Sequence, residues 1–249
     1  MLEVAAPGLL VVKHHRGEMG KFVNVAVLEG DQIKVIDELA SNLPDCPMLV
    51  TSLLGFDTSG TLAAGSINVL VQTAVSMRRH GRGGSLLVVP ADTDVWRESI
   101  VRPVPYAISP VFSELAGLVR RPAEERRERG WQDAIAESID AVAGLTAVDG
   151  ATVMTDRYDL LAFGAKITRR SGHPQVEQVT WTEPIEGGLA AVVHPSRIGG
   201  TRHLSAAQFV HDQRDAVALV ASQDGRFTIF AWSPCEDMVH AHRVEALLL

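Results

Sequence analysis

The sequence has few cysteines and no excess of basic charge. Two cysteines among 249 residues, Cys46 and Cys235, can build neither a disulfide scaffold nor a four-cysteine zinc site. We expect both to be free thiols in a reducing compartment, which favours the cytoplasm. The 30 acidic residues outnumber the 23 basic ones, which excludes a broad nucleic-acid-binding face, so no DNA partner is expected. A local phosphate site remains compatible with this charge.

Long hydrophobic runs are also absent. No apolar stretch approaches the roughly 20 residues that cross a bilayer, and the first residues lack the charged start and apolar block of a signal peptide. We therefore expect a cytoplasmic protein with no membrane partner. The hydrophobic fraction of 46% is that of a globular chain, and the length suits one large domain or two small ones.

Residues 1–62 are predicted to form a small strand-rich N-terminal segment. Its β-branched runs are separated by glycine and charged residues, and a hairpin turn at Gly30–Asp31 would join the second run to the third. These runs cover residues 9–14, 22–28 and 33–36. A further apolar run, 48–54, precedes a glycine-containing break at 55–65.

From residue 66 the hydrophobic period becomes that of a helix. Apolar residues recur three and four positions apart, with Ser66 as the expected N-cap and Gly81 as the expected stop. We interpret the glycine-rich segment 81–84 as a helix-to-strand turn, because it precedes the strand 85–89. That strand is apolar throughout, which is typical of the centre of an α/β sheet.

The rest of the chain alternates between helices and strands after an irregular stretch, 91–129. Its prolines exclude one long helix, and its charge run, 123–130, is expected to be exposed. Helices are predicted over 131–145 and 204–213, and strands over 152–154, 160–167, 176–181, 216–221 and 227–232, the last two as a closing hairpin.

This alternation predicts an α/β fold, with a mixed central β-sheet flanked by helices. We expect this domain to cover residues 66–235. Residues 236–249 would form a C-terminal tail, with His240 and His242 on an exposed terminal strand. Two histidines make an incomplete zinc site, so no metal is expected there.

Asp149-Gly150-Ala151 follows the second predicted helix and precedes an apolar strand. A carboxylate at such a position can bind Mg²⁺ or accept a hydroxyl proton, and the neighbouring glycine lets a ligand approach the backbone. The same residues also form ordinary turns.

A second motif, Gly199-Gly200-Thr201-Arg202-His203, precedes a predicted helix. Glycines free the backbone amides, a helix N-terminus favours an anion, and the three polar side chains add donors, so the chemistry is that of a phosphate cradle. The alternative is a glycine turn whose arginine caps nearby carbonyls.

A third motif, Ser222-Gln223-Asp224-Gly225, ends a predicted strand. Ligands of open α/β sheets gather at strand ends, but these residue types are also those of a hairpin turn.

The order of these motifs resembles the nucleotide-binding domain of the diadenylate cyclases, which is also the first domain of the DNA-integrity scanning proteins. That family is marked by a DGA motif, a later GTRHR motif, and a serine at the end of the following strand. The matching residues here are Asp149-Gly150-Ala151, Thr201-Arg202-His203 and Ser222. The resemblance covers about residues 66–232.

The resemblance implies a domain that binds ATP. In the family, two such domains face each other as a homodimer with opposed sites and join two ATP molecules into cyclic di-AMP with Mg²⁺ or Mn²⁺. Asp149 would be the catalytic and metal-binding residue, and Gly150 and Ala151 would lie against the nucleoside. The remaining nucleotide-binding residues would be Gly200, Thr201, Arg202 and His203 at the phosphates, with Ser222 beside them.

Two departures from the family pattern bear on catalysis. Leu204 replaces the arginine after the histidine, and Gln223 replaces a glutamate found in many members. The chain is therefore similar to sensor-type offshoots of the family, such as the DACNV type. The expected function is a sensor domain that binds ATP or a cyclic dinucleotide with little or no turnover. The alternatives are an active diadenylate cyclase and a structural module with a vestigial site.

Overall fold

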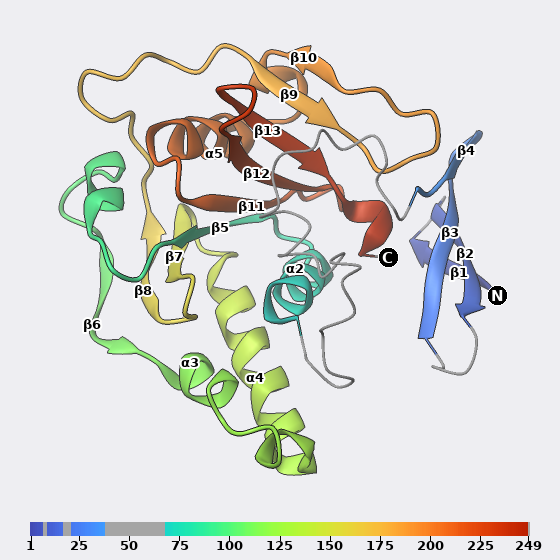
Figure 1. The fold of residues 1–249 in the computed structure, drawn as a ribbon, viewed down its shortest axis with the longest axis horizontal. Helices are drawn as coiled ribbons and strands as arrows, with labels where there is room; N and C mark the ends of the chain where they lie inside the picture. The colour runs from blue at the N-terminus through green and yellow to red at the C-terminus, as the bar shows by residue number, and fades with distance from the viewer. Residues whose placement is uncertain (7–8, 17–20, 38–67, 249) are drawn as a thin grey trace.

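The structure is a computed structural model, and it describes residues 1–6, 9–16, 21–37 and 68–248 (Figure 1). Cys46, Ser66, the apolar run 48–54 and the break 55–65 lie outside the described residues. In the part of the chain that is described, no helix has both the length and the apolar character required to cross a membrane.

A mixed sheet of nine strands forms the centre of the molecule. Its strands are β5 (Gly84–Val89), β6 (Tyr106–Phe112), β7 (Ala151–Thr155), β8 (Leu160–Ala165), β9 (Val179–Thr182), β10 (Ala191–Val193), β11 (Val217–Ala221), β12 (Phe227–Ser233) and β13 (Met238–Arg243). They lie in the order β10-β9-β13-β12-β11-β5-β7-β8-β6. The β5–β7 and β13–β9 pairs are parallel and the other pairs are antiparallel.

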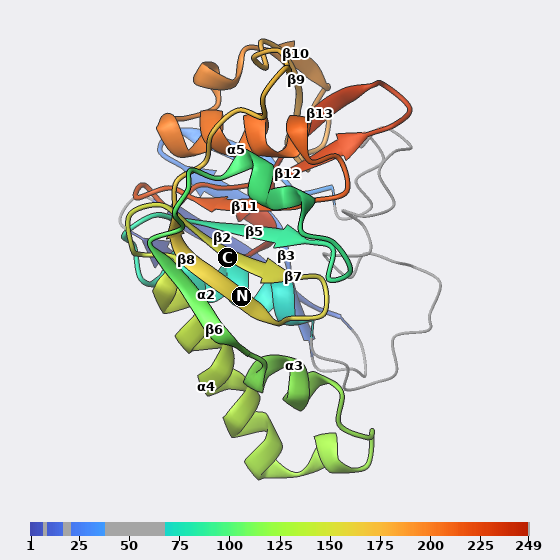
Figure 2. The same cartoon turned by 90° about the vertical axis from the view of Figure 1, so that its left-hand side faces the viewer.

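Helices cover both faces of this sheet (Figure 2). One face carries α2 (Val69–Arg79), α3 (Glu114–Val119) and α4 (Arg129–Leu145), and the other carries α5 (Thr201–Asp212). Short 3-10 helices span Val95–Ser99, Glu125–Arg127, Pro195–Arg197 and Glu245–Leu247. Each face of the sheet has its own hydrophobic core, so the predicted α/β fold with a mixed, helix-flanked sheet is confirmed.

The strand predicted at the centre of the sheet is β5. All six of its residues are buried, because β11 and β7 flank it and helices cover both faces. Leu86 and Val88 face the core beneath α2 and α4, whereas Leu87 and Val89 face the core beneath α5. A strand in this environment has no solvent-facing side, and its continuous apolar sequence follows from that.

Helix α2 begins later than predicted. Its N-cap is Asn68, whose side-chain oxygen accepts a hydrogen bond from the Val71 amide at 3.1 Å. The predicted end is confirmed: the helix stops at Arg79, and Gly81 adopts a φ of +65°.

Two strands of the central sheet and one helix have no counterpart in the sequence prediction. The irregular stretch 91–129 contains β6 and α3, and β10 follows the β9 strand. Strand β6 lies at the sheet edge and is exposed along nearly all of its length, so its sequence shows no apolar alternation. The charge run 123–130 is exposed as predicted, except for the partly buried Arg126.

The predicted C-terminal tail is instead part of the central sheet. Strand β13 pairs with β12 on one side and with β9 on the other. His240 and His242 are therefore fully buried, and the expectation of an exposed terminal strand is wrong. The cause is β9, which lies far away in sequence and covers the edge that β13 would otherwise expose.

Burial makes His242 a source of acid sensitivity. The Nδ1 atom of His242 lies 2.7 Å from Thr182 Oγ1, while Nε2 has no hydrogen-bond partner in the part of the chain that the structure describes. Desolvation, with a smaller contribution from the charge of His240, lowers the pKa of His242 from 6.5 to about 3. Below pH 6.5, His242 therefore binds a proton in the unfolded chain but stays neutral in the folded chain. The free energy of unfolding consequently falls as the pH falls toward 3.

We expect this effect to approach about 1.4 kcal/mol of unfolding free energy per pH unit below about pH 6. His242→Gln keeps a polar partner for Thr182 but does not titrate. Urea unfolding from pH 7 to pH 5 should give a shallower loss of stability in this variant than in the wild type. Parallel curves for the two proteins would contradict the assignment.

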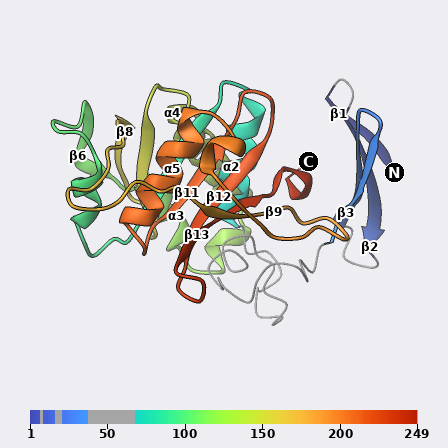
Figure 3. The same cartoon turned by 90° about the horizontal axis from the view of Figure 1, so that it is seen from above.

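A second, four-stranded antiparallel sheet forms the N-terminal segment, in the order β1-β2-β3-β4. Its strands are β1 (Leu2–Ala6), β2 (Leu9–Arg16), β3 (Lys21–Glu29) and β4 (Gln32–Val35). The three predicted strands and the turn at Gly30–Asp31 are confirmed, and β1 is additional. This sheet lies beside the C-terminal end of the chain (Figure 3), where Val27 and Ile36 pack with Ala246.

Candidate functional site

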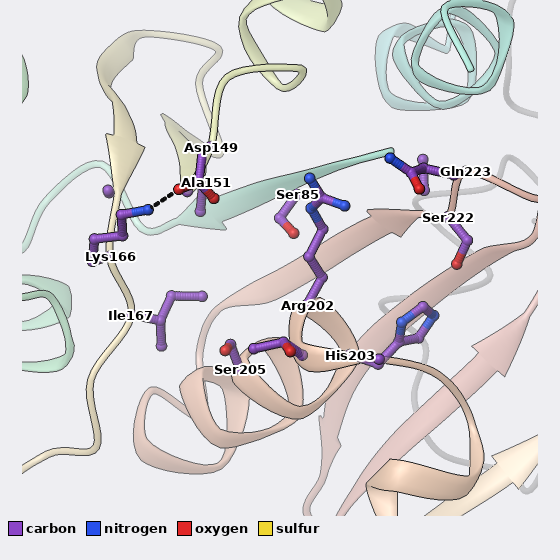
Figure 4. Close-up of a pocket in the computed structure, with 15 residues that line it drawn as sticks. Ser85, Asp149, Ala151, Lys166, Ile167, Arg202, His203, Ser205, Ser222 and Gln223 are labelled. Carbon is purple, nitrogen blue, oxygen red and sulfur yellow. Dashed lines mark hydrogen bonds and ion pairs between the residues drawn. The ribbon is translucent and has the colours of Figure 1, made fainter. Parts of the chain in front are cut away.

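A cleft of about 590 Å³ lies at one end of the strands in the middle of the central sheet, where β5 and β7 begin and β8 and β11 end. The first turn of α5 forms one wall (Figure 4). Its volume is in the range of small-molecule sites. The lining residues are Ser85, Asp149, Gly150, Ala151, Ala165, Lys166, Ile167, Gly200, Thr201, Arg202, His203, Ser205, Ala221, Ser222 and Gln223.

Small side chains make room for this cleft. Ser85, Ala151 and Ala165 stand on the adjacent strands β5, β7 and β8. Deeper in the sheet, Leu87 and Val153 fill the core beneath α5. The hollow therefore lies where the side chains on three neighbouring strands become small, next to the beginning of the helix.

The structure brings all the predicted site residues to this cleft. They come from segments that are far apart in the sequence, and the sheet order places those segments side by side. The eight residues are Asp149, Gly150, Ala151, Gly200, Thr201, Arg202, His203 and Ser222.

Arg202 extends from the first turn of α5 into the middle of the cleft, between Ser85 and Gln223 (Figure 4). Among the described residues, its guanidinium group forms no hydrogen bond or ion pair. A Cβ atom on Gly83 would lie 2.9 Å from Arg202 Nη1, so the glycine leaves the space that the guanidinium occupies. Arg202 caps no carbonyl of the described residues, so the alternative interpretation of the motif is not observed in that part of the chain. The 81–84 segment is a helix-to-strand turn as predicted, and it also shapes the cleft.

Gly200 occupies the N-cap position of α5, and it has no side chain that could cap the helix. No side chain of the described residues accepts a hydrogen bond from the first amides of this helix. The helix begins at Thr201, three residues before the predicted Leu204, so the motif forms its first turn. An uncapped helix N-terminus presents free N–H groups and a partial positive charge, both of which suit an anion.

His203 forms part of the cleft wall, and its burial disfavours the positively charged form. Its ring is buried, with Nε2 at 3.4 Å from Thr228 Oγ1 and an edge-to-face contact with Phe230. Desolvation lowers the pKa of His203. A Cβ atom on Gly199 would lie 2.3 Å from His203 Nδ1, so this glycine is required for the packing of the ring.

Asp149 lies at the lip of the cleft, with 88% of its side chain exposed, and pairs with the Lys166 ammonium (Figure 4). The hydrogen bond from Lys166 and then its charge lower the pKa of Asp149, and Arg202 adds a weaker contribution. Sequence reasoning missed Lys166 because it placed this residue inside a strand running to Ile167. The strand β8 ends at Ala165, and a lysine directly after a strand end was the available signal.

The two departures from the family pattern lie in different places. Gln223 lines the cleft and its amide donates to the Arg82 carbonyl at 3.4 Å. Leu204 is partly buried and lines a neighbouring hollow with Val176 and Gln208, outside the cleft. If an arginine replaced Leu204, its side chain would therefore leave the helix into the neighbouring hollow and not into the cleft.

The hairpin interpretation of the Ser222–Gly225 segment is confirmed, and the ligand-binding interpretation stays a prediction. It is the turn of the β11–β12 hairpin, closed by a hydrogen bond of 3.2 Å from the Gly225 amide to the Ser222 carbonyl. The Ser222 side chain also reaches the cleft (Figure 4).

A separate group of metal-binding side-chain types lies at the other end of α5. Asp212 Oδ1 is 3.2 Å from the Nδ1 atoms of His173 and His211. The same carboxylate accepts hydrogen bonds from Gln208 Nε2 at 3.0 Å and from the Arg170 amide at 2.8 Å. Both carboxylate oxygens thus have protein donors, and the group is not connected to the cleft.

The search against protein-family models found no match to this chain, and no curated protein matches it. The resemblance to the diadenylate cyclase domain therefore stands on the sequence motifs alone.

Proposed function

We propose that the cleft binds a nucleotide, either ATP or a cyclic dinucleotide, and that the chain is a cytoplasmic sensor domain with little or no turnover. The observation that carries this proposal is the guanidinium of Arg202, which has no partner among the described residues and extends into the cleft beside the N-terminus of α5. Charged donors at a helix N-terminus suit phosphate groups. A partly buried arginine without a partner costs desolvation free energy, and in a purely structural module nothing would offset this cost.

The rest of the lining suits the other parts of a nucleotide. Ala151 and Ile167 offer apolar surface to a base, while Thr201, Ser205 and Ser222 offer hydroxyl groups. Apolar walls with a few polar groups are characteristic of small-molecule sites.

The state of Asp149 supports the sensor over the cyclase. Asp149 is the only carboxylate among the described residues that line the cleft, and an ammonium group already pairs with it. An active diadenylate cyclase remains the second candidate, because the high exposure of Asp149 leaves it accessible to an opposed copy of the chain. Such a homodimer with facing sites is part of that alternative.

Calorimetry and product analysis test the proposal together. We expect the wild-type chain to bind ATP or cyclic di-AMP and, when incubated with ATP and Mn²⁺, to give no cyclic di-AMP detectable by mass spectrometry. Robust synthesis would replace the sensor with the cyclase. Absence of binding to every nucleotide tested, by a folded protein, would favour the vestigial structural module.

A further inference from the structure

We propose that the Lys166 ammonium occupies the place of a divalent cation at Asp149, so that nucleotide binding at the cleft does not depend on metal. This inference rests on the proposed function. The family resemblance implies Mg²⁺ or Mn²⁺ at Asp149, and the residues of this chain do not suit either ion there.

The side chains that line the cleft do not fit a divalent cation. Magnesium sites in proteins use one or two carboxylates together with phosphate oxygens and water. Here the one lining carboxylate, Asp149, is engaged by Lys166, and Arg202 adds a second positive charge nearby. The other polar side chains are hydroxyls, one amide and the neutral ring of His203: Ser85, Thr201, Ser205, Ser222 and Gln223 complete the set. A metal ion at Asp149 would have to displace an ammonium group and approach a guanidinium.

Sheet register places Lys166 beside Asp149. Ala165 pairs directly with Ala151, so the residue after β8 and the residues before β7 meet at the same sheet edge. The backbones are in close contact, because a Cβ atom on Gly150 would lie 2.5 Å from the carbonyl carbon of Gly164. The ammonium is thus held near the carboxylate by two adjacent strands rather than by a long loop.

The charges then suit an anionic ligand without added metal. Lys166 and Asp149 cancel each other and His203 is neutral, so the positive charge of Arg202 is left over. An ammonium group has three donors, which allows Lys166 to keep its bond to Asp149 while it donates to a phosphate oxygen. Lys166 can thus give a phosphate oxygen a positively charged donor at the place where a bound metal would contact it.

The experiment compares nucleotide affinity in EDTA with affinity in Mg²⁺, using the nucleotide that binds the wild-type chain in calorimetry. We expect the two wild-type affinities to agree within about twofold. In Lys166→Met, which keeps an unbranched side chain one atom shorter than lysine but removes the charge, affinity in EDTA should fall at least about tenfold. Mg²⁺ or Mn²⁺ should restore most of it, because Asp149 is then released for a metal ion.

Two variants serve as controls. Lys166→Arg keeps a cation and should retain binding that is independent of metal. Arg157→Met removes an exposed cation whose ion pair with Asp92, 2.6 Å long, lies outside the cleft, and it should leave both affinities unchanged.

The outcomes separate this inference from the proposed function. A wild-type chain that binds nucleotide only in Mg²⁺ overturns the inference and leaves the sensor intact, and this arm needs no variant to fold. Equal affinity of Lys166→Met and wild type in EDTA overturns it as well. A folded wild-type chain that binds no nucleotide in either buffer overturns the proposed function and the inference with it.

Discussion

Arg202→Ala should weaken nucleotide binding about 10- to 150-fold, which corresponds to about 1.5–3 kcal/mol for a hydrogen bond to a charged group. The Arg202 guanidinium has no protein partner among the described residues, so its loss removes a donor from the ligand and breaks no internal interaction. For the same reason the free energy of unfolding should change little. Calorimetry with the bound nucleotide and urea unfolding measure the two quantities.

Arg120→Ala is the matched control. Arg120 is exposed to solvent, whereas Arg202 is partly buried; Arg120 pairs with Asp159 at 3.3 Å and lies outside the cleft. This variant has the same net charge as Arg202→Ala and should bind with nearly wild-type affinity. Equal weakening in both variants would point to general electrostatics, and unchanged affinity in a folded Arg202→Ala would remove the phosphate role from the cleft.

The site was predictable from sequence where its chemistry is local. A helix start with glycines and an arginine can be recognised within five residues, and Arg202 is positioned as that pattern predicts. Lys166 and the charge of His203 were not predictable in this way. The first depends on the register between β7 and β8, and the second depends on packing against Thr228 and Phe230.

In the fold, too, only the elements with a local signal were predictable from sequence. A strand buried on both faces, such as β5, is recognised by its continuous apolar sequence. Strand β13 has the sequence Met-Val-His-Ala-His-Arg, and its two histidines predict a solvent-exposed strand. Its pairing with β9, which the local sequence does not reveal, buries them. Strand β6 is exposed on nearly every residue, so nothing in its sequence distinguishes it from a loop. Elements whose burial is decided by distant segments leave little signal in their own residues.

Gly150→Ala should reduce the free energy of unfolding by about 2–6 kcal/mol. Gly150 has a φ of +109°, which an alanine adopts only with strain of about 1–3 kcal/mol. The added Cβ would also lie 2.5 Å from the carbonyl carbon of Gly164 and 2.6 Å from its oxygen. Both atoms belong to the backbone of a neighbouring strand, so relief requires the strands to separate, at a further cost of about 1–3 kcal/mol.

Gly144→Ala provides the comparison, because Gly144 is exposed within α4 and a Cβ there would meet nothing within 4 Å. That variant should be more stable than the wild type by up to about 1 kcal/mol, from the better helix propensity of alanine. Urea unfolding of the two variants therefore gives changes of opposite sign. A neutral Gly150→Ala would mean that β7 and β8 do not hold the backbone contact that places Lys166 beside Asp149, and the metal-independent binding argued from that contact would lose its structural basis.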